Sequence, residues 1–175
     1  MSTPVRVQIP RKLYDAMLAQ AFAEFPNECV GLLAAKLDNP DVWIRVERRY
    51  ALVNALASPV EYLAGWVVPG GVLAQLINAQ ASSVEYLSSD TSMLAAHVDM
   101  RENGLDIVAV YHSHPTTEPI PSRKDLERNY SPDVVNFILS LKGPTPVMRG
   151  WWLTETDFRE AEWECLDENG GDGPT

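Results

Sequence analysis

Two short, almost uninterrupted apolar runs constrain the fold of this chain most strongly. The first covers residues 28–35 (ECVGLLAA), and the second covers residues 105–111 (LDIVAVY). Apolar runs of this length without polar alternation are typical of strands that are covered on both faces of a sheet. A sheet of this kind needs helices packed against it, so the two runs favour a layered α/β domain.

The remaining helices and strands are predicted from the spacing of apolar residues. Apolar residues at helical spacing predict a helix over residues 11–25, and two more helices are predicted over residues 90–103 and 122–130. We therefore expect a mixed α/β fold, with a central mixed β-sheet flanked by helices. Further strands are expected over residues 5–9, 42–53, 134–141, 148–154 and 158–166. The face of the first helix that we expect to be buried consists of Leu13, Met17, Leu18, Ala21, Phe22 and Phe25.

The length of 175 residues fits a single domain. We expect this domain over residues 1–168, followed by a flexible acidic tail over residues 169–175. Within the domain, residues 63–84 contain no Lys, Arg, Asp or Glu. We interpret this segment as an insertion or flap, with an ordinary packed excursion as an equal alternative.

Charge, apolar stretches and cysteine content argue against several classes of protein. The formal net charge is −10, which disfavours a nucleic-acid-binding surface. No apolar stretch reaches the roughly 18 residues of a membrane-spanning helix, and the N-terminus has no apolar signal core. The two cysteines, Cys29 and Cys165, cannot form a disulfide framework, so a reducing cytoplasm is expected. The sequence leaves the oligomeric state open, a homodimer included.

Candidate metal-binding side chains occur where the second apolar run ends, at His112-Ser113-His114-Pro115. Residues i and i+2 of a strand point to the same side, so the two imidazoles should share one face. Asp125 follows eleven positions after His114, which is far enough for the chain to turn back. Two imidazoles and one carboxylate form a ligand set for catalytic zinc, with a fourth position left for water.

Each half of this pattern also has a simpler explanation. Two histidines at strand spacing can be coincidence or core packing. Ser122 and Asp125 fit a capping box at the start of a short helix, in which both side chains bond to backbone N–H groups. Two of the three histidines in the chain end an apolar strand and are followed by a proline-rich loop and this serine–aspartate pair, so the joint pattern favours metal binding.

The order of these residues resembles a known motif. Glu28, followed by residues 112–115 (HSHP) and then by Ser122 and Asp125, resembles the JAMM motif of the MPN+ metalloproteases, which include eukaryotic deubiquitinases and small prokaryotic members. Residues 26–33 (PNECVGLL) and 54–59 (NALASP) also resemble the small prokaryotic members. The resemblance extends from about residue 5 to residue 162, is weakest over residues 63–84, and implies a single-domain MPN/JAB-type fold.

The resemblance also implies a role for each residue of the motif. His112, His114 and Asp125 would bind Zn²⁺, Glu28 would act as general acid and base on the zinc-bound water, and Ser122 would donate a hydrogen bond to the developing oxyanion. The implied reaction is hydrolysis of a peptide or isopeptide bond. The implied substrate is the C-terminal tail of a ubiquitin-like or sulfur-carrier protein, with residues 63–84 as the candidate flap over that tail.

Three other functions fit the sequence less well. A metallo-β-lactamase would have further Asp and His directly after the histidine pair, where this chain has Pro115 and two threonines. A zinc nucleobase deaminase would have a downstream Pro-Cys-x-x-Cys, which the sequence lacks. A non-catalytic MPN scaffold that binds partners is the third alternative, and it is disfavoured because this chain keeps every ligand of the motif.

Overall fold

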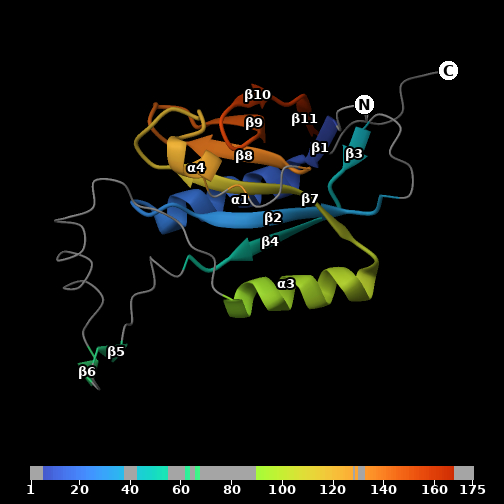
Figure 1. The fold of residues 1–175 in the computed structure, drawn as a ribbon, viewed down its shortest axis with the longest axis horizontal. Coiled ribbons are helices and arrows are strands. Elements are labelled where there is room, and N and C mark those ends of the chain that lie inside the picture. The colour runs from blue at the N-terminus through green and yellow to red at the C-terminus, as the bar shows by residue number, and fades with distance from the viewer. Residues whose placement is uncertain are drawn as a thin grey trace.

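The computed structural model describes residues 6–37, 43–54, 62–63, 66–67, 90–127, 129 and 133–167. Its centre is a six-stranded sheet in which β7 and β8 are parallel and all other neighbours are antiparallel (Figure 1). The strands in spatial order are β10 (Phe158–Glu160), β9 (Val147–Leu153), β8 (Val135–Ser140), β7 (Asp106–His114), β2 (Val30–Ala35) and β4 (Arg48–Leu52). The expected central mixed sheet is therefore confirmed.

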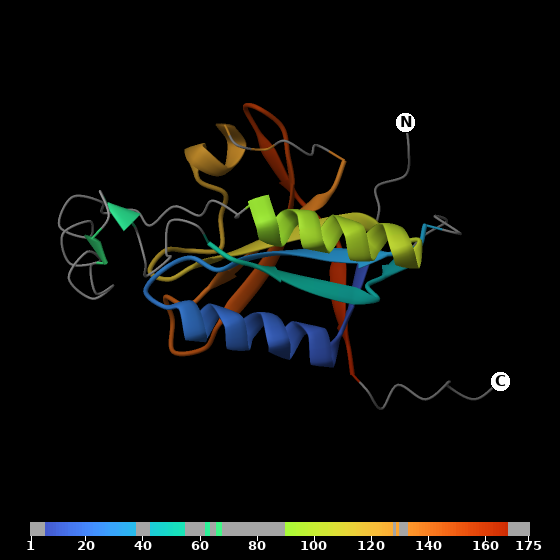
Figure 2. The same cartoon turned by 90° about the horizontal axis from the view of Figure 1, so that it is seen from below.

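Helices cover both faces of this sheet (Figure 2). Helix α1 (Arg11–Glu24) lies on one face, while α3 (Asp90–Asn103) and the short α4 (Arg123–Glu127) lie on the other. Alternate residues of β2 pack against the helices on opposite faces of the sheet. Leu33 belongs to the cluster that includes Met17 of α1, whereas Leu32 belongs to the cluster that includes Ala96 and Met100 of α3. The first apolar run is thus buried on both sides, as its composition predicted.

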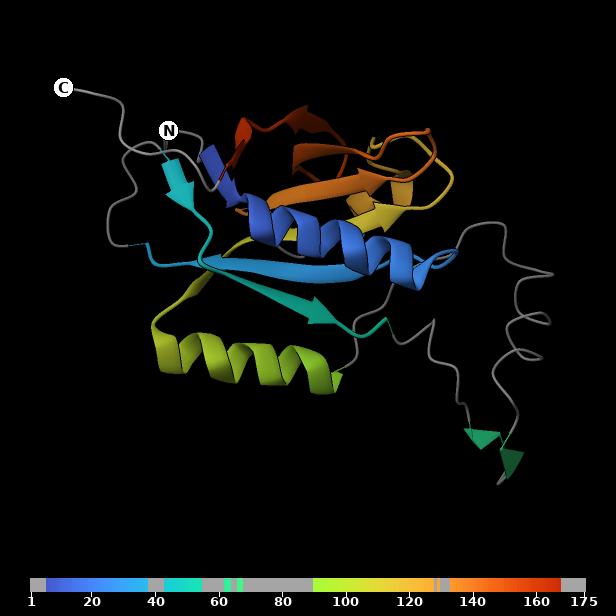
Figure 3. The same cartoon turned by 180° about the vertical axis from the view of Figure 1, so that it is seen from behind.

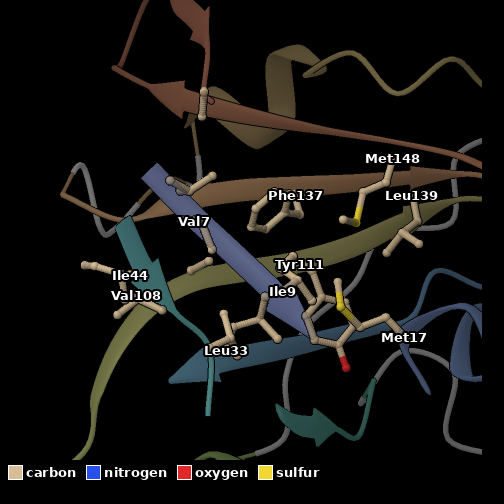
Figure 4. Packing of buried hydrophobic residues seen from close by; sticks show 14 of the residues in the cluster. Val7, Ile9, Met17, Leu33, Ile44, Val108, Tyr111, Phe137, Leu139 and Met148 are labelled. Carbon is tan, nitrogen blue, oxygen red and sulfur yellow. The ribbon is translucent and has the colours of Figure 1, made fainter. Parts of the chain in front are cut away.

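The largest apolar cluster fills the space on the α1 side of the sheet. Figure 4 shows Met17 close to Tyr111, with Leu33 on the neighbouring strand and Phe137 further along the sheet. β7 lies in the interior of the sheet between β8 and β2, and six of its nine residues are buried. The site at the end of β7 is consequently built on a strand that is buried and paired on both sides.

A second, three-stranded sheet closes the α1 side of the molecule. It has the order β11 (Trp163–Leu166), β1 (Arg6–Pro10) and β3 (Trp43–Arg45), and β1 is parallel to both neighbours. The chain passes from β1 directly into α1 (Figure 3). A separate antiparallel pair is formed by β5 (Tyr62–Leu63) and β6 (Trp66–Val67).

The buried face of α1 is narrower than expected. Met17 and Ala21 are buried, but Phe22 and Phe25 are 57% and 53% exposed. Phe22 lies about 100° around the helix from Ala21, and the helix ends at Glu24, before Phe25. The prediction that these two phenylalanines face the core is therefore wrong.

Two expectations lie wholly or largely outside the described residues. The acidic tail over residues 169–175 is not described, and of the candidate flap over residues 63–84 only residues 63 and 66–67 are. Within the part of the chain that the structure describes, no helix is long and apolar enough to cross a membrane.

Candidate metal centre

His112 and His114 lie at the carboxyl end of β7 and point to the face of the sheet that carries α3 and α4. Their exposed fractions are 1% and 5%, and β2 and β8 flank the strand on both sides. The two Nε2 atoms are 3.2 Å apart. The alternation of the strand therefore brings the two rings together, as the sequence predicted.

Asp125 of α4 completes a group of three. Its Oδ1 is 3.3 Å from His112 Nε2, and its Oδ2 is 3.7 Å from His114 Nε2. The three candidate ligand atoms all lie within 4.8 Å of one another. Zinc in tetrahedral coordination, with bonds of about 2.0–2.1 Å, separates its nitrogen and oxygen ligands by about 3.3–3.4 Å. The three side chains could therefore hold a zinc ion after only small shifts.

Burial and the contacts within the group shift the pKa values of Asp125 and His114 in opposite directions. Burial alone would raise the pKa of Asp125, but the contacts with His112 and His114 hold it well below its usual value. Burial alone would lower the pKa of His114, yet the Asp125 carboxylate and the carbonyl of Glu118 leave it raised. An ionised carboxylate is thus held against two imidazoles, which is the charge distribution that a divalent cation prefers.

Ser122 and Asp125 also form the capping box that was the simpler alternative. The amide of Ser122 donates to Asp125 Oδ2 at 2.6 Å, and the amide of Asp125 donates to Ser122 Oγ at 3.3 Å. The two interpretations are compatible, because one carboxylate serves both. The cap fixes the orientation in which Asp125 meets the histidines, and it leaves Ser122 exposed beside them.

A backbone carbonyl sets the tautomer of His114. Its Nδ1 is 2.8 Å from the carbonyl oxygen of Glu118. A carbonyl only accepts hydrogen bonds, so Nδ1 carries a proton, and Nε2, the atom that faces Asp125, is the nitrogen that a neutral His114 would offer to a metal ion. The same arrangement orients many metal-binding histidines.

Glu28 lies two residues before β2, the strand that pairs with β7. Val30 pairs with His112 in an antiparallel register, and continuing this register by two residues places Glu28 opposite His114. Glu28 is half-buried, and its charge is among the influences that raise the pKa of His114. A carboxylate is thus available beside the group of three, although the separation of 84 residues between Glu28 and His112 gave no local signal in the sequence.

Two residues that support Glu28 were not singled out as site residues from the sequence. Ser113 Oγ accepts a hydrogen bond from the amide of Cys29 at 2.8 Å, and the buried Asn54 donates from Nδ2 to the carbonyl of Glu28 at 2.8 Å. The role of Ser113 could be foreseen in part, since alternation turns it away from the histidines. Asn54 acts on a backbone atom, for which the sequence offers no signal.

Comparisons with known proteins identify the family of the chain. A family model described as prokaryotic homologues of the JAB domain matches residues 10–154. The CysO-cysteine peptidase of Mycobacterium tuberculosis is 28% identical over 132 residues, which cover 75% of this chain and 71% of that protein. The probable TtuB-protein conjugate cleaving protease of Thermus thermophilus is 28% identical over 119 residues, which cover 68% of this chain and 60% of that protein.

The fold of the chain is also similar to that of a solved structure. The solution structure of a protein from Desulfitobacterium hafniense matches with a TM-score of 0.67 and 30% sequence identity, covering 93% of this chain and 94% of that one. The match of the family model spans most of the chain, from the end of β1 to the end of β9. The chain therefore belongs to the family of prokaryotic JAB-domain homologues.

Proposed function

We propose that this chain is a zinc metallopeptidase that hydrolyses a peptide or isopeptide bond at the C-terminal tail of a ubiquitin-like or sulfur-carrier protein. The observation that carries the proposal is the convergence of His112, His114 and Asp125 at the carboxyl end of β7, with their ligand atoms within 4.8 Å of one another. Two neutral nitrogens and one carboxylate leave a fourth position of a tetrahedron open, which is typical of catalytic rather than structural zinc.

Each residue of the motif has a part in this chemistry. Zinc, when bound, acts as a Lewis acid and lowers the pKa of coordinated water toward about 7. Glu28 takes the proton from the attacking water and returns it to the leaving amine. The hydroxyl of Ser122 donates to the carbonyl oxygen as that oxygen gains negative charge. The supporting observations are that the charge of Glu28 acts on His114 and that Ser122 is exposed beside Asp125.

The kind of substrate is supported by the names of the relatives. One is a peptidase for CysO-cysteine, and another is a probable protease for TtuB-protein conjugates. The first name describes a small adduct and the second describes a protein conjugate. Both kinds of substrate are therefore included in the test.

The test combines metal analysis with a cleavage assay. The purified chain is analysed for zinc and then incubated with sulfur-carrier proteins from the same genome, each carrying either a C-terminal cysteine or an isopeptide-linked protein. Intact mass is the readout, with a chelator-treated sample and a zinc-restored sample as controls. We expect loss of the C-terminal group only in the samples that contain metal.

Two other outcomes would count against the proposal. Stoichiometric zinc without cleavage of any carrier would favour the non-catalytic scaffold. Cleavage that survives complete removal of metal would assign the activity to other residues.

A further inference from the structure

The loop over residues 115–121 joins the two halves of the candidate metal centre. It leaves β7 directly after His114 and leads to Ser122 and Asp125 at the start of α4. Three of its seven residues are prolines, whose φ angles are fixed by the ring. The position of this loop therefore affects the ligands at both of its ends.

Three consecutive carbonyls of this loop each accept a hydrogen bond from the side chain of a different strand. The carbonyl of Thr117 accepts from Ser140 Oγ of β8 at 2.6 Å, and that of Pro119 accepts from Trp151 Nε1 of β9 at 2.9 Å. The carbonyl between them, that of Glu118, accepts from His114 Nδ1 of β7 at 2.8 Å. Neighbouring strands of the central sheet thus hold the loop on either side of the peptide unit that sets the His114 ring.

The two outer donors are buried within the sheet. Ser140 is 3% exposed and Trp151 is 4% exposed, and each makes its bond to the loop from a fixed strand position. A further contact to the loop differs in kind. Glu118 Oε1 and Lys142 Nζ are 2.8 Å apart, but both side chains are more than half exposed, so this ion pair adds little rigidity.

We propose that Ser140 and Trp151 are positioning residues for the metal centre. They hold the Glu118 carbonyl against His114 Nδ1 and thereby keep the Nε2 lone pair directed at the metal position. This inference rests on the proposed function, because it takes His114 to be a metal ligand. Neither residue is one of the three candidate ligands.

The test measures metal affinity in variants that remove one donor each. Ser140→Ala removes the hydroxyl, and Trp151→Phe removes the indole N–H while keeping an aromatic ring. Replacing a direct partner of a ligating histidine weakens metal binding by about 10- to 100-fold. These residues act one step further out, so we expect Zn²⁺ affinity to fall about fivefold in each variant, measured by competition with a chromophoric chelator. The visible spectrum of the Co²⁺ form should broaden as the ligand geometry loosens.

The chain offers matched controls for both variants. Trp152→Phe makes the same change one residue along β9, where Trp152 packs against the cluster on the other face. Lys142→Ala removes the exposed ion pair to the loop. Both controls should bind Zn²⁺ within about twofold of the unchanged chain. Ser140→Thr retains the hydroxyl and should restore affinity, which a loss of stability alone would not do.

The results separate this inference from the proposed function. Unchanged zinc affinity in Ser140→Ala and Trp151→Phe, in a chain that itself binds zinc, would overturn the positioning role alone. Equal losses in the two controls, in proportion to their melting temperatures, would also overturn it, because they would indicate general destabilisation. A chain that binds neither Zn²⁺ nor Co²⁺ would remove the metal role of His114 and this inference with it.

Discussion

Cys29, directly before β2, and Ser113 of β7 are joined by two hydrogen bonds. The amide of Cys29 donates to Ser113 Oγ at 2.8 Å, and the amide of Ser113 donates to the carbonyl of Cys29 at 3.1 Å. Each of these residues is the sequence neighbour of a candidate site residue, namely Glu28 on one strand and His112 and His114 on the other. The pair therefore fixes how the candidate proton carrier sits relative to the candidate ligands.

Replacing Ser113 by Ala should impair turnover more than metal binding. The change removes the only side-chain oxygen that the described residues offer to the Cys29 amide, and burial of an unsatisfied N–H is expected to cost about 1–3 kcal/mol. Glu28 would shift with the strand end, whereas His112 and His114 remain on β7. We expect kcat to fall about tenfold or more with the zinc content unchanged. Ser113→Thr, which retains the hydroxyl, is the control, and an equal loss in that variant would argue for steric disruption.

Replacing Glu28 by Gln should abolish most turnover and leave zinc in place. The amide has nearly the shape of the carboxylate but cannot carry the proton between water and leaving group. We expect kcat to fall by at least about 100-fold, measured by intact mass of the cleaved carrier beside a zinc determination. Glu127→Gln on α4 removes an exposed carboxylate that pairs with Arg123, and it should have no effect. Full activity of Glu28→Gln would remove this residue from the mechanism.

Replacing Asp125 by Asn separates the two roles of this side chain. The amide oxygen can still accept from the Ser122 amide, so the helix cap is retained. The negative charge is lost, and we expect zinc affinity to fall by at least about 100-fold. Ser122→Ala makes the opposite change, since it removes the cap hydroxyl and keeps the carboxylate. If Asp125→Asn binds zinc as tightly as the unchanged chain, Asp125 is only a cap.

The thiol of Cys29 should be chemically inert despite its place beside Glu28. Burial raises its pKa to about 11, although the hydrogen bond with Ser113 opposes this shift. The thiolate is the reactive form, so at pH 8 Cys29 should resist iodoacetamide until the protein unfolds. Peptide mapping should find Cys165, which is only partly buried, alkylated first. Rapid modification of Cys29 with loss of activity would point to a thiol nucleophile instead.

The parts of the fold that follow from local pattern were predictable from the sequence. The apolar runs gave the buried strands β2 and β7, and the alternation of β7 gave the shared face of His112 and His114. The outward position of Phe22 was not predictable, because it depends on how α1 rotates against the sheet. Contacts to backbone atoms were also not predictable, because every residue has a carbonyl group. The contact of the Glu118 carbonyl with His114 and that of Asn54 with the Glu28 carbonyl are of this kind.

Gly31 on β2 should tolerate no side chain. It pairs with Tyr111 of β7, and a Cβ atom at this position would overlap the tyrosine ring. The ring cannot move aside easily, because its hydroxyl donates to Gln20 Oε1 at 2.5 Å and accepts from Arg49 Nη1 at 2.8 Å. Overpacking of a core typically costs about 1–3 kcal/mol, and we expect Gly31→Ala to lower the free energy of unfolding by about 3 kcal/mol.

Urea denaturation of the metal-free chain measures this effect on Gly31→Ala without a contribution from zinc. Gly143→Ala is the matched control, because the nearest atom to its added Cβ, the carbonyl oxygen of Thr145, lies at an ordinary distance of 3.5 Å. That variant should change the free energy of unfolding by less than about 0.5 kcal/mol. Combining Gly31→Ala with Tyr111→Leu should cost less than the sum of the two single changes, because the smaller side chain removes the overlap. Strict additivity would show that the ring of Tyr111 is not what excludes a side chain at position 31.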